Sequence, residues 1–118
     1  MYIRTGLPTY QIGGLTFKPG DVLGRTKPGS IIEHRVVIGF DGAIAHSPGP
    51  GDVFRPGSLD DILMAGSQIR VVYPTGSLAE SEQRFARANQ IMGVSWWKMN
   101  CHQTTDFVVG VPPCPWLT

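Results

Sequence analysis

The stretch IIEHRVVIGFDGAIAH, residues 31–46, decides the fold. Residues 31–40 are rich in β-branched side chains and predict a strand, Asp41-Gly42 is a turn signal, and residues 43–46 fit a return strand. The stretch therefore predicts a β-hairpin with a histidine on each strand, His34 on the first and His46 on the second.

Two registers of this hairpin place the histidines differently. A two-residue loop at Asp41-Gly42 sets Val37 opposite His46 and sends the two imidazoles to opposite faces of the sheet. A three-residue loop puts its final glycine in the left-handed position of a bulge turn and sets Val36 opposite His46. His34 then becomes a diagonal neighbour of His46 on the same face, about 7–8 Å away at the backbone. We favour the second register.

Turn signals divide the rest of the first half into short elements. Residues 1–20 are expected to form a lead-in with at most one short strand, because Gly-Gly and Pro-Gly pairs interrupt them. Further strands are predicted at 21–24, 53–55 and 69–73. A short helix with a capping-box pattern is expected to begin at Ser58 and to end at Gly66.

Two longer helices are predicted in the second half. The first opens with another capping box at Ser77, and its apolar stripe is expected to comprise Leu78, Phe85, Ala88 and Met92. The last starts at Asn100, with Gln103 completing the cap, and ends at Gly110 before a Pro-rich tail at 111–118. This order predicts one α+β domain over residues 1–118, with a small antiparallel β-sheet packed with helices.

Cys101 is the candidate nucleophile because it directly follows the predicted N-cap. A helix start points unpaired backbone N–H groups and the positive end of the helix dipole at the sulfur, which favours the thiolate. His34 is the candidate base, and His46 is expected to orient it, as a third polar group does in catalytic triads. Each of these residues alone is more often structural. Their combination predicts thiol catalysis.

Neighbouring residues supply the candidate substrate contacts. Trp96 and Trp97 could line a substrate groove, and Asn100 lies beside the nucleophile. His102 is expected to point away from the site. A zinc site from His34, His46 and Cys101 is chemically possible but contains no close ligand pair in sequence, so thiol catalysis ranks above it.

Composition narrows the function classes. The ten basic residues are scattered and the formal net charge is +1, which argues against nucleic-acid binding. No stretch is long and apolar enough for a transmembrane segment or a signal peptide, so we expect a cytoplasmic protein, with signal-independent export left open. Cys101 and Cys114 fit neither a metal-site spacing nor a disulfide framework. We expect no cofactor and no metal.

The same residues give the chain a resemblance to a known family. The matching pieces are residues 20–23, the hairpin 33–46, the segments 58–61 and 69–72, the helix 84–93, and Asn100-Cys101 with Phe107 and Gly110. This pattern resembles the lecithin:retinol acyltransferase-like family, a circularly permuted branch of the NlpC-type papain-like superfamily. The resemblance covers most of residues 21–110.

The resemblance implies a permuted papain-like fold and a set of roles. His34 matches the general base of the family, His46 its orienting residue and Cys101 its nucleophile. The family cleaves ester or amide bonds through an acyl-cysteine intermediate, and some members pass the acyl group to an acceptor other than water. Here His102-Gln103-Thr104 follows Cys101 in place of the common Glu-His-Phe, so the wall beside the nucleophile differs.

We therefore expect a cysteine-dependent hydrolase that acts on an amide, peptide or ester bond. An amide or peptide substrate is favoured, because the chain lacks the apolar C-terminal helix of membrane-anchored relatives. Two alternatives stay open: a thiol acyltransferase or phospholipase-type enzyme acting on acyl lipids, and a non-catalytic binding module with a papain-like fold. The sequence does not predict an oligomeric state.

Overall fold

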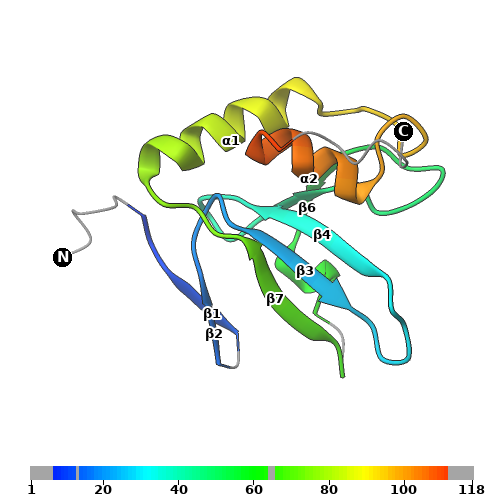
Figure 1. The fold of residues 1–118 in the computed structure, drawn as a ribbon, viewed down its shortest axis with the longest axis horizontal. Helices are drawn as coiled ribbons and strands as arrows, with labels where there is room; N and C mark the ends of the chain where they lie inside the picture. Colours follow the sequence, from blue (N-terminus) through cyan, green and yellow to red (C-terminus); the bar gives the residue numbers. More distant parts are fainter. Residues whose placement is uncertain (1–6, 13, 64–65, 112–118) are drawn as a thin grey trace.

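The computed structural model describes residues 7–12, 14–63 and 66–111, which form two antiparallel sheets and two α-helices (Figure 1). The smaller sheet pairs β1 (Tyr10–Ile12) with β2 (Leu15–Phe17). The larger sheet has the order β6-β5-β4-β3-β7, and its strands are β3 (Val22–Thr26), β4 (Glu33–Ile38), β5 (Ile44–His46), β6 (Arg55–Gly57) and β7 (Gln68–Tyr73). The predicted α+β class with an antiparallel sheet is confirmed.

The β4–β5 hairpin has the favoured register. Val37 pairs with Ala45, so Val36 lies opposite His46 and His34 is the diagonal neighbour of His46. A three-residue loop closes the hairpin, because the N–H of Gly39 donates to the carbonyl of Ala43 at 2.7 Å. Gly42 has φ +79°, the left-handed conformation that this bulge turn requires.

Several strand predictions need correction. The lead-in contains two strands, β1 and β2, rather than at most one. The strand predicted from residue 31 begins at Glu33, and Ile31 and Ile32 are 98% and 76% exposed in the loop before it. The strand predicted at 53–55 lies at Arg55–Gly57, where Pro56 is tolerated because β6 is an edge strand. β3 and β7 lie within two residues of their predicted bounds.

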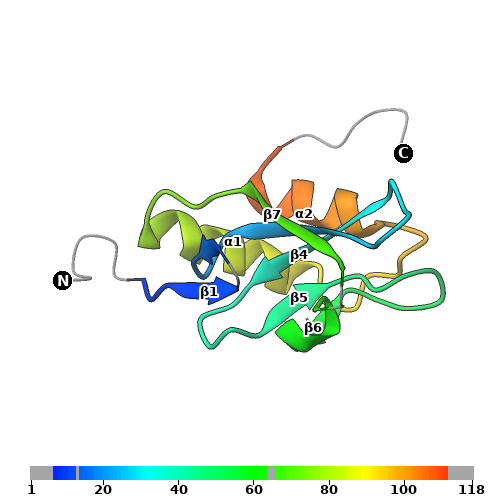
Figure 2. The same cartoon turned by 90° about the horizontal axis from the view of Figure 1, so that it is seen from below.

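Side chains alternate between two cores on the two faces of the larger sheet. Val36 and Ile38 belong to one core, with Leu23, Ile44, Phe17 of β2 and Ile62. Val37 belongs to the other, with Val22 and Phe54 and with residues of both helices. Figure 2 shows the sheet from the side away from the helices, with β5 and β6 in the foreground. By the same alternation, His34 lies on the face that the helices do not cover.

The helices follow their caps closely. A 3₁₀ turn, Leu59–Asp61, opens with the predicted capping box at Ser58. The helix α1 (Leu78–Gln90) is capped by Ser77, but the Glu80 carboxylate accepts from the Gly76 N–H at 2.7 Å and not from the cap residue. The helix α2 (Cys101–Val109) has the predicted Asn100–Gln103 box, with Gly110 at φ +85° as its C-cap.

The buried face of α1 differs from the predicted stripe. It carries Ser81, Arg84 and Ala88, whereas Met92 is exposed and lies beyond the helix. The Arg84 guanidinium donates to the carbonyls of Gly20, Tyr73 and Pro74, which explains how a charge is accommodated there. Hydrogen bonds of Arg84 therefore hold part of the face of α1 that was predicted to pack through apolar side chains alone.

None of the described helices combines the length and the apolar character needed to cross a bilayer. The Pro-rich tail predicted at 111–118 lies, apart from Val111, outside the described residues, and so does Cys114.

Candidate active site

The cap of α2 places Cys101 at the first helical position. The Asn100 side-chain oxygen accepts from the N–H groups of His102 and Gln103, each at 3.0 Å, and Gln103 Oε1 accepts from the Asn100 N–H at 3.0 Å. Both halves of the capping box are therefore present, as the sequence predicted. The side chain of Asn100 is used for this cap, and Asn100 does not line the cavity described below.

The first turn of α2 covers an edge of β4 that β5 leaves open. β5 ends at His46, so residues 33–35 of β4 have no strand on that side. His102 Nε2 lies 2.6 Å from the carbonyl oxygen of Glu33, and because a carbonyl only accepts, the imidazole donates. By the alternation of an antiparallel ladder, the N–H of Arg35 points to the same open side. The helix start thus replaces the missing strand.

The thiol of Cys101 is half-buried beside this edge. Burial raises its pKa above the ordinary thiol value, although the backbone N–H groups of Arg35, Cys101 and His102 and the charge of Arg35 act in the opposite direction. Cys101 therefore rests as a neutral thiol at neutral pH, and it needs a base to become a nucleophile.

The two hairpin histidines form a pair. His34 Nε2 lies 2.8 Å from His46 Nδ1, and the rings meet edge to face with an interplanar angle of 64°. Burial, followed by the nearby charges of His46 and Arg25, lowers the pKa of His34 to about 4. Burial and then Arg55 lower the pKa of His46, against the opposing charges of Asp61 and Asp52. Both rings are therefore neutral at neutral pH, as a general base has to be.

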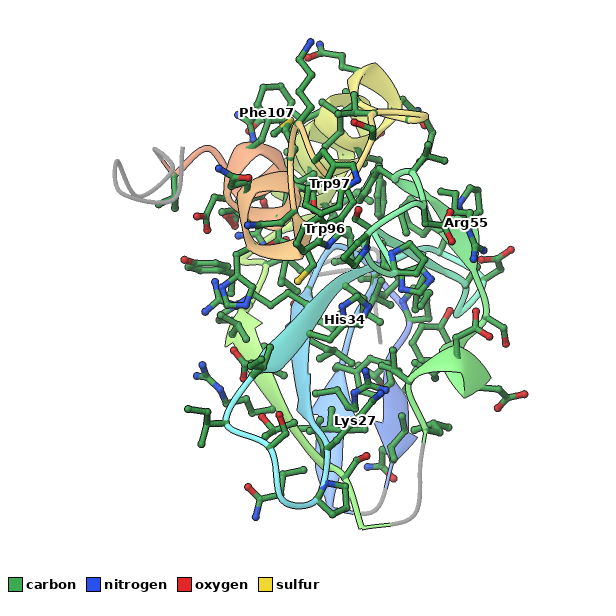
Figure 3. The ribbon with its side chains drawn as sticks, turned by 90° about the vertical axis from the view of Figure 1, so that its right-hand side faces the viewer. Lys27, His34, Arg55, Trp96, Trp97 and Phe107 are labelled. Carbon is green, nitrogen blue, oxygen red and sulfur yellow. The ribbon has the colours of Figure 1, made fainter. Side chains whose placement is uncertain are left out.

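His34 and Cys101 open onto one cavity of about 290 Å³. The cavity lies where the chain leaves the sheet after β5, and the other lining residues are Arg25, Lys27, Ser30, Ile32, Pro48, Gly49, Pro50 and Trp96. Figure 3 shows His34 between Trp96, toward α2, and Lys27 at the far end of β3. His46 lies behind His34 and does not line the cavity. Both groups face the same space, and in the described part of the chain no hydrogen bond joins the thiol to the His34 ring.

The two tryptophans have different positions. Trp96 is half-buried and lines the cavity, in line with its predicted place in a substrate groove. Trp97 is 74% exposed, does not line the cavity, and packs edge-on against Trp96 at a centroid distance of 5.1 Å. Trp97 therefore lies outside the lining of this cavity, and its predicted substrate contact stays a prediction.

The sequence analysis missed the two basic residues of the cavity, Arg25 and Lys27. Arg25 lies on β3 directly opposite His34, in a strand that is otherwise small or apolar up to that point. A charged residue inside such a strand is the signal that could have identified it.

The described residues gather no metal centre. Among residues 7–12, 14–63 and 66–111, no three His, Cys, Asp or Glu side chains gather as a metal site requires, which leaves the zinc alternative without structural support. Comparison with protein-family models finds no match, and no curated protein matches the chain.

Proposed function

We propose that the chain is a cysteine-dependent hydrolase with a permuted papain-like fold, in which Cys101 is the nucleophile and His34 the base. The observation that carries the proposal is the shared cavity, onto which a helix-capped thiol and a neutral, histidine-paired imidazole both open. The order His34, His46, Cys101 along the chain is the one implied by the resemblance to the lecithin:retinol acyltransferase-like family.

The first half of the reaction forms an acyl-enzyme. His34 Nδ1 takes the proton of Cys101 as the sulfur attacks the substrate carbonyl, and the negative charge that develops on oxygen meets the backbone N–H of Cys101. The tetrahedral intermediate collapses, the C–N or C–O bond breaks, and His34 returns the proton to the departing amine or alcohol. The product of this half is a thioester on Cys101.

The second half releases the acid. His34 takes a proton from water as the water oxygen attacks the thioester. The C–S bond then breaks and His34 returns the proton to the sulfur, which gives the carboxylic acid and the free thiol. His46 holds His34 in the required orientation and tautomer throughout. Neither half of the reaction requires a cofactor.

The test is to trap the acyl-enzyme. Wild type and Cys101→Ala are incubated with a panel of activated esters and short peptide amides, and intact mass is measured after rapid acid quench. The proposal expects an added acyl mass on wild type that is absent in Cys101→Ala and strongly reduced in His34→Ala. Acylation that survives in Cys101→Ala would overturn the assignment of the nucleophile.

Two observations favour other functions. Ile31 and Ile32 are exposed, and Ile32 also lines the cavity, which favours a thiol acyltransferase or phospholipase acting on acyl lipids. The raised pKa of Cys101 favours a non-catalytic binding module. In the same assay, an acyl mass from long-chain esters alone supports the lipid enzyme, and no acyl mass from any probe supports the binding module.

A further inference from the structure

We propose that the cavity binds an anionic group of the substrate through Arg25 and Lys27, so that the preferred acyl donor carries a carboxylate or a phosphate. That the bound molecule is an acyl donor rests on the proposed function. The binding site itself can be tested without turnover.

Arg25 is a buried cation without a counter-ion. It is 9% exposed, and in the described part of the chain it makes no ion pair with a carboxylate. Its Nε is buried and has no hydrogen-bond partner. A buried charge without a partner is costly, and an anion bound from outside the chain would offset that cost. The contrast is Arg84, whose guanidinium meets three carbonyls.

The cavity around Arg25 is positive. Lys27 lines it from the end of the same strand, and none of the described residues that line it is acidic. The guanidinium offers a planar fork of donors that suits a carboxylate or phosphate, and the lysine adds a second point charge. The thiol opens onto the same space, so an anion held by Arg25 belongs to the molecule whose carbonyl is attacked.

Anion binding also affects the base. The positive charges of Arg25 and Lys27 add to burial and His46 in lowering the pKa of His34, and His102 acts in the same direction. A bound anion offsets the first two charges. His34 then becomes a stronger base when the correct substrate is present, which couples recognition to catalysis.

The experiment uses matched acyl probes that differ in the terminal group of the acyl chain. Mono-p-nitrophenyl succinate carries a carboxylate, p-nitrophenyl 3-phosphonopropionate carries a phosphonate, and p-nitrophenyl butyrate is neutral. The measured quantity is the ratio of kcat/KM for each anionic probe to kcat/KM for the neutral probe. Wild type is expected to prefer an anionic probe roughly tenfold or more, as a charged hydrogen bond would give. The preferred anion distinguishes the carboxylate source from the phosphate source.

Three variants locate the preference. Arg25→Gln and Lys27→Gln are expected to lower the ratio, whereas Lys98→Gln, which removes an exposed charge away from the cavity lining, is expected to keep it. Lys27 is exposed, so its variant carries the test if Arg25→Gln does not fold. Equal ratios in wild type and in the Arg25 and Lys27 variants would overturn the proposal.

A binding measurement separates this proposal from the catalytic one. Folded Cys101→Ala is titrated with succinate and with inorganic phosphate, and binding is followed by tryptophan fluorescence, because Trp96 lines the cavity. Saturable binding that Lys27→Gln weakens supports the anion site even if no probe acylates the wild type. Absence of binding to both anions overturns the site, whatever the acylation assay shows.

Discussion

His34 Nε2 and His46 Nδ1 lie 2.8 Å apart, so one of these two nitrogens carries the shared hydrogen and the other accepts it. His34 can act as a base through Nδ1 only if its own Nε2 is the donor. His46 then carries its hydrogen on Nε2, which is buried and has no hydrogen-bond partner within the described ranges. The negative charge of Asp61, which acts to raise the pKa of His46, favours this arrangement.

Substitution of His46 is expected to reduce activity less than substitution of His34. His34→Ala removes the base, a loss of about 10²–10⁴ in kcat/KM. His46→Ala removes only the orienting acceptor, and His46→Asn restores an oxygen near the Nδ1 position and recovers part of the activity. Steady-state kinetics on variants with native circular dichroism measure these effects. Equal and complete loss in the His34 and His46 variants would mean that the two roles are not separate.

Gly57→Ala is expected to displace the imidazole of His46, because the added methyl group would lie against its Nε2 side. A Cβ at this position would lie 2.7 Å from Asp61 Oδ2 and 2.9 Å from His46 Nε2, closer than such atoms can approach. The expected cost is about 1–3 kcal/mol of unfolding free energy, together with a lower kcat/KM. Gly14→Ala is the matched control, because nothing lies within 4 Å of its added Cβ. Thermal denaturation and kinetics of both variants provide the test. If Gly57→Ala had the same unfolding free energy and kcat/KM as wild type, the predicted steric clash with His46 and Asp61 would be contradicted.

The pH dependence follows from the neutral histidines. With the pKa of His34 lowered from 6.5 to about 4, kcat/KM should rise with pH through an acid limb near 4. The unfolded chain binds more protons than the folded one between these two pH values, so the unfolding free energy should increase from pH 4 to 6.5. Urea denaturation across this range measures the slope. His34→Ala should reduce the slope, and a slope of opposite sign would contradict burial of the neutral ring.

The cap of α2 is expected to matter for activity as well as stability. Asn100→Ala should cost about 1 kcal/mol of unfolding free energy, the usual value for a lost N-cap. Because Cys101 follows the cap, kcat should fall too. Ser77→Ala removes the cap of α1 and is the matched control, with a similar stability loss and normal kcat. Similar kinetics in both variants would show that the cap does not position the thiol.

His102 is expected to position α2 against β4. His102→Ala leaves the Glu33 carbonyl without its donor and should lower kcat more than it raises KM, because the thiol is displaced rather than the substrate. His102→Gln supplies an amide N–H and should recover part of the loss. Comparison of the change in kcat with the change in KM shows whether His102 positions the thiol or only stabilises the fold. Failure of glutamine to recover more activity than alanine would argue against this contact.

The sequence predicted what depends on local pattern. The hairpin register follows from alternation and from one glycine, and the caps at Ser58, Ser77 and Asn100 follow from short motifs. The predicted stripe of α1 was right at Ala88 but did not include the buried Arg84, because the tertiary carbonyls that accommodate Arg84 are not revealed by helical periodicity. Contacts such as that of His102 with Glu33 join residues 69 positions apart, so only the assembled sheet brings them together.

The short length of β5 has a consequence for the chemistry. His34 belongs to the face of the sheet away from α2, and Cys101 belongs to α2, so a continuous strand between them would form a wall. The chain leaves the sheet after His46 and opens a passage at that point. A variant with two more paired residues in β5 would keep every reactive group and would still separate the Cys101 thiol from the His34 imidazole. The length of β5, and not residue identity alone, therefore controls whether a proton can pass between Cys101 and His34.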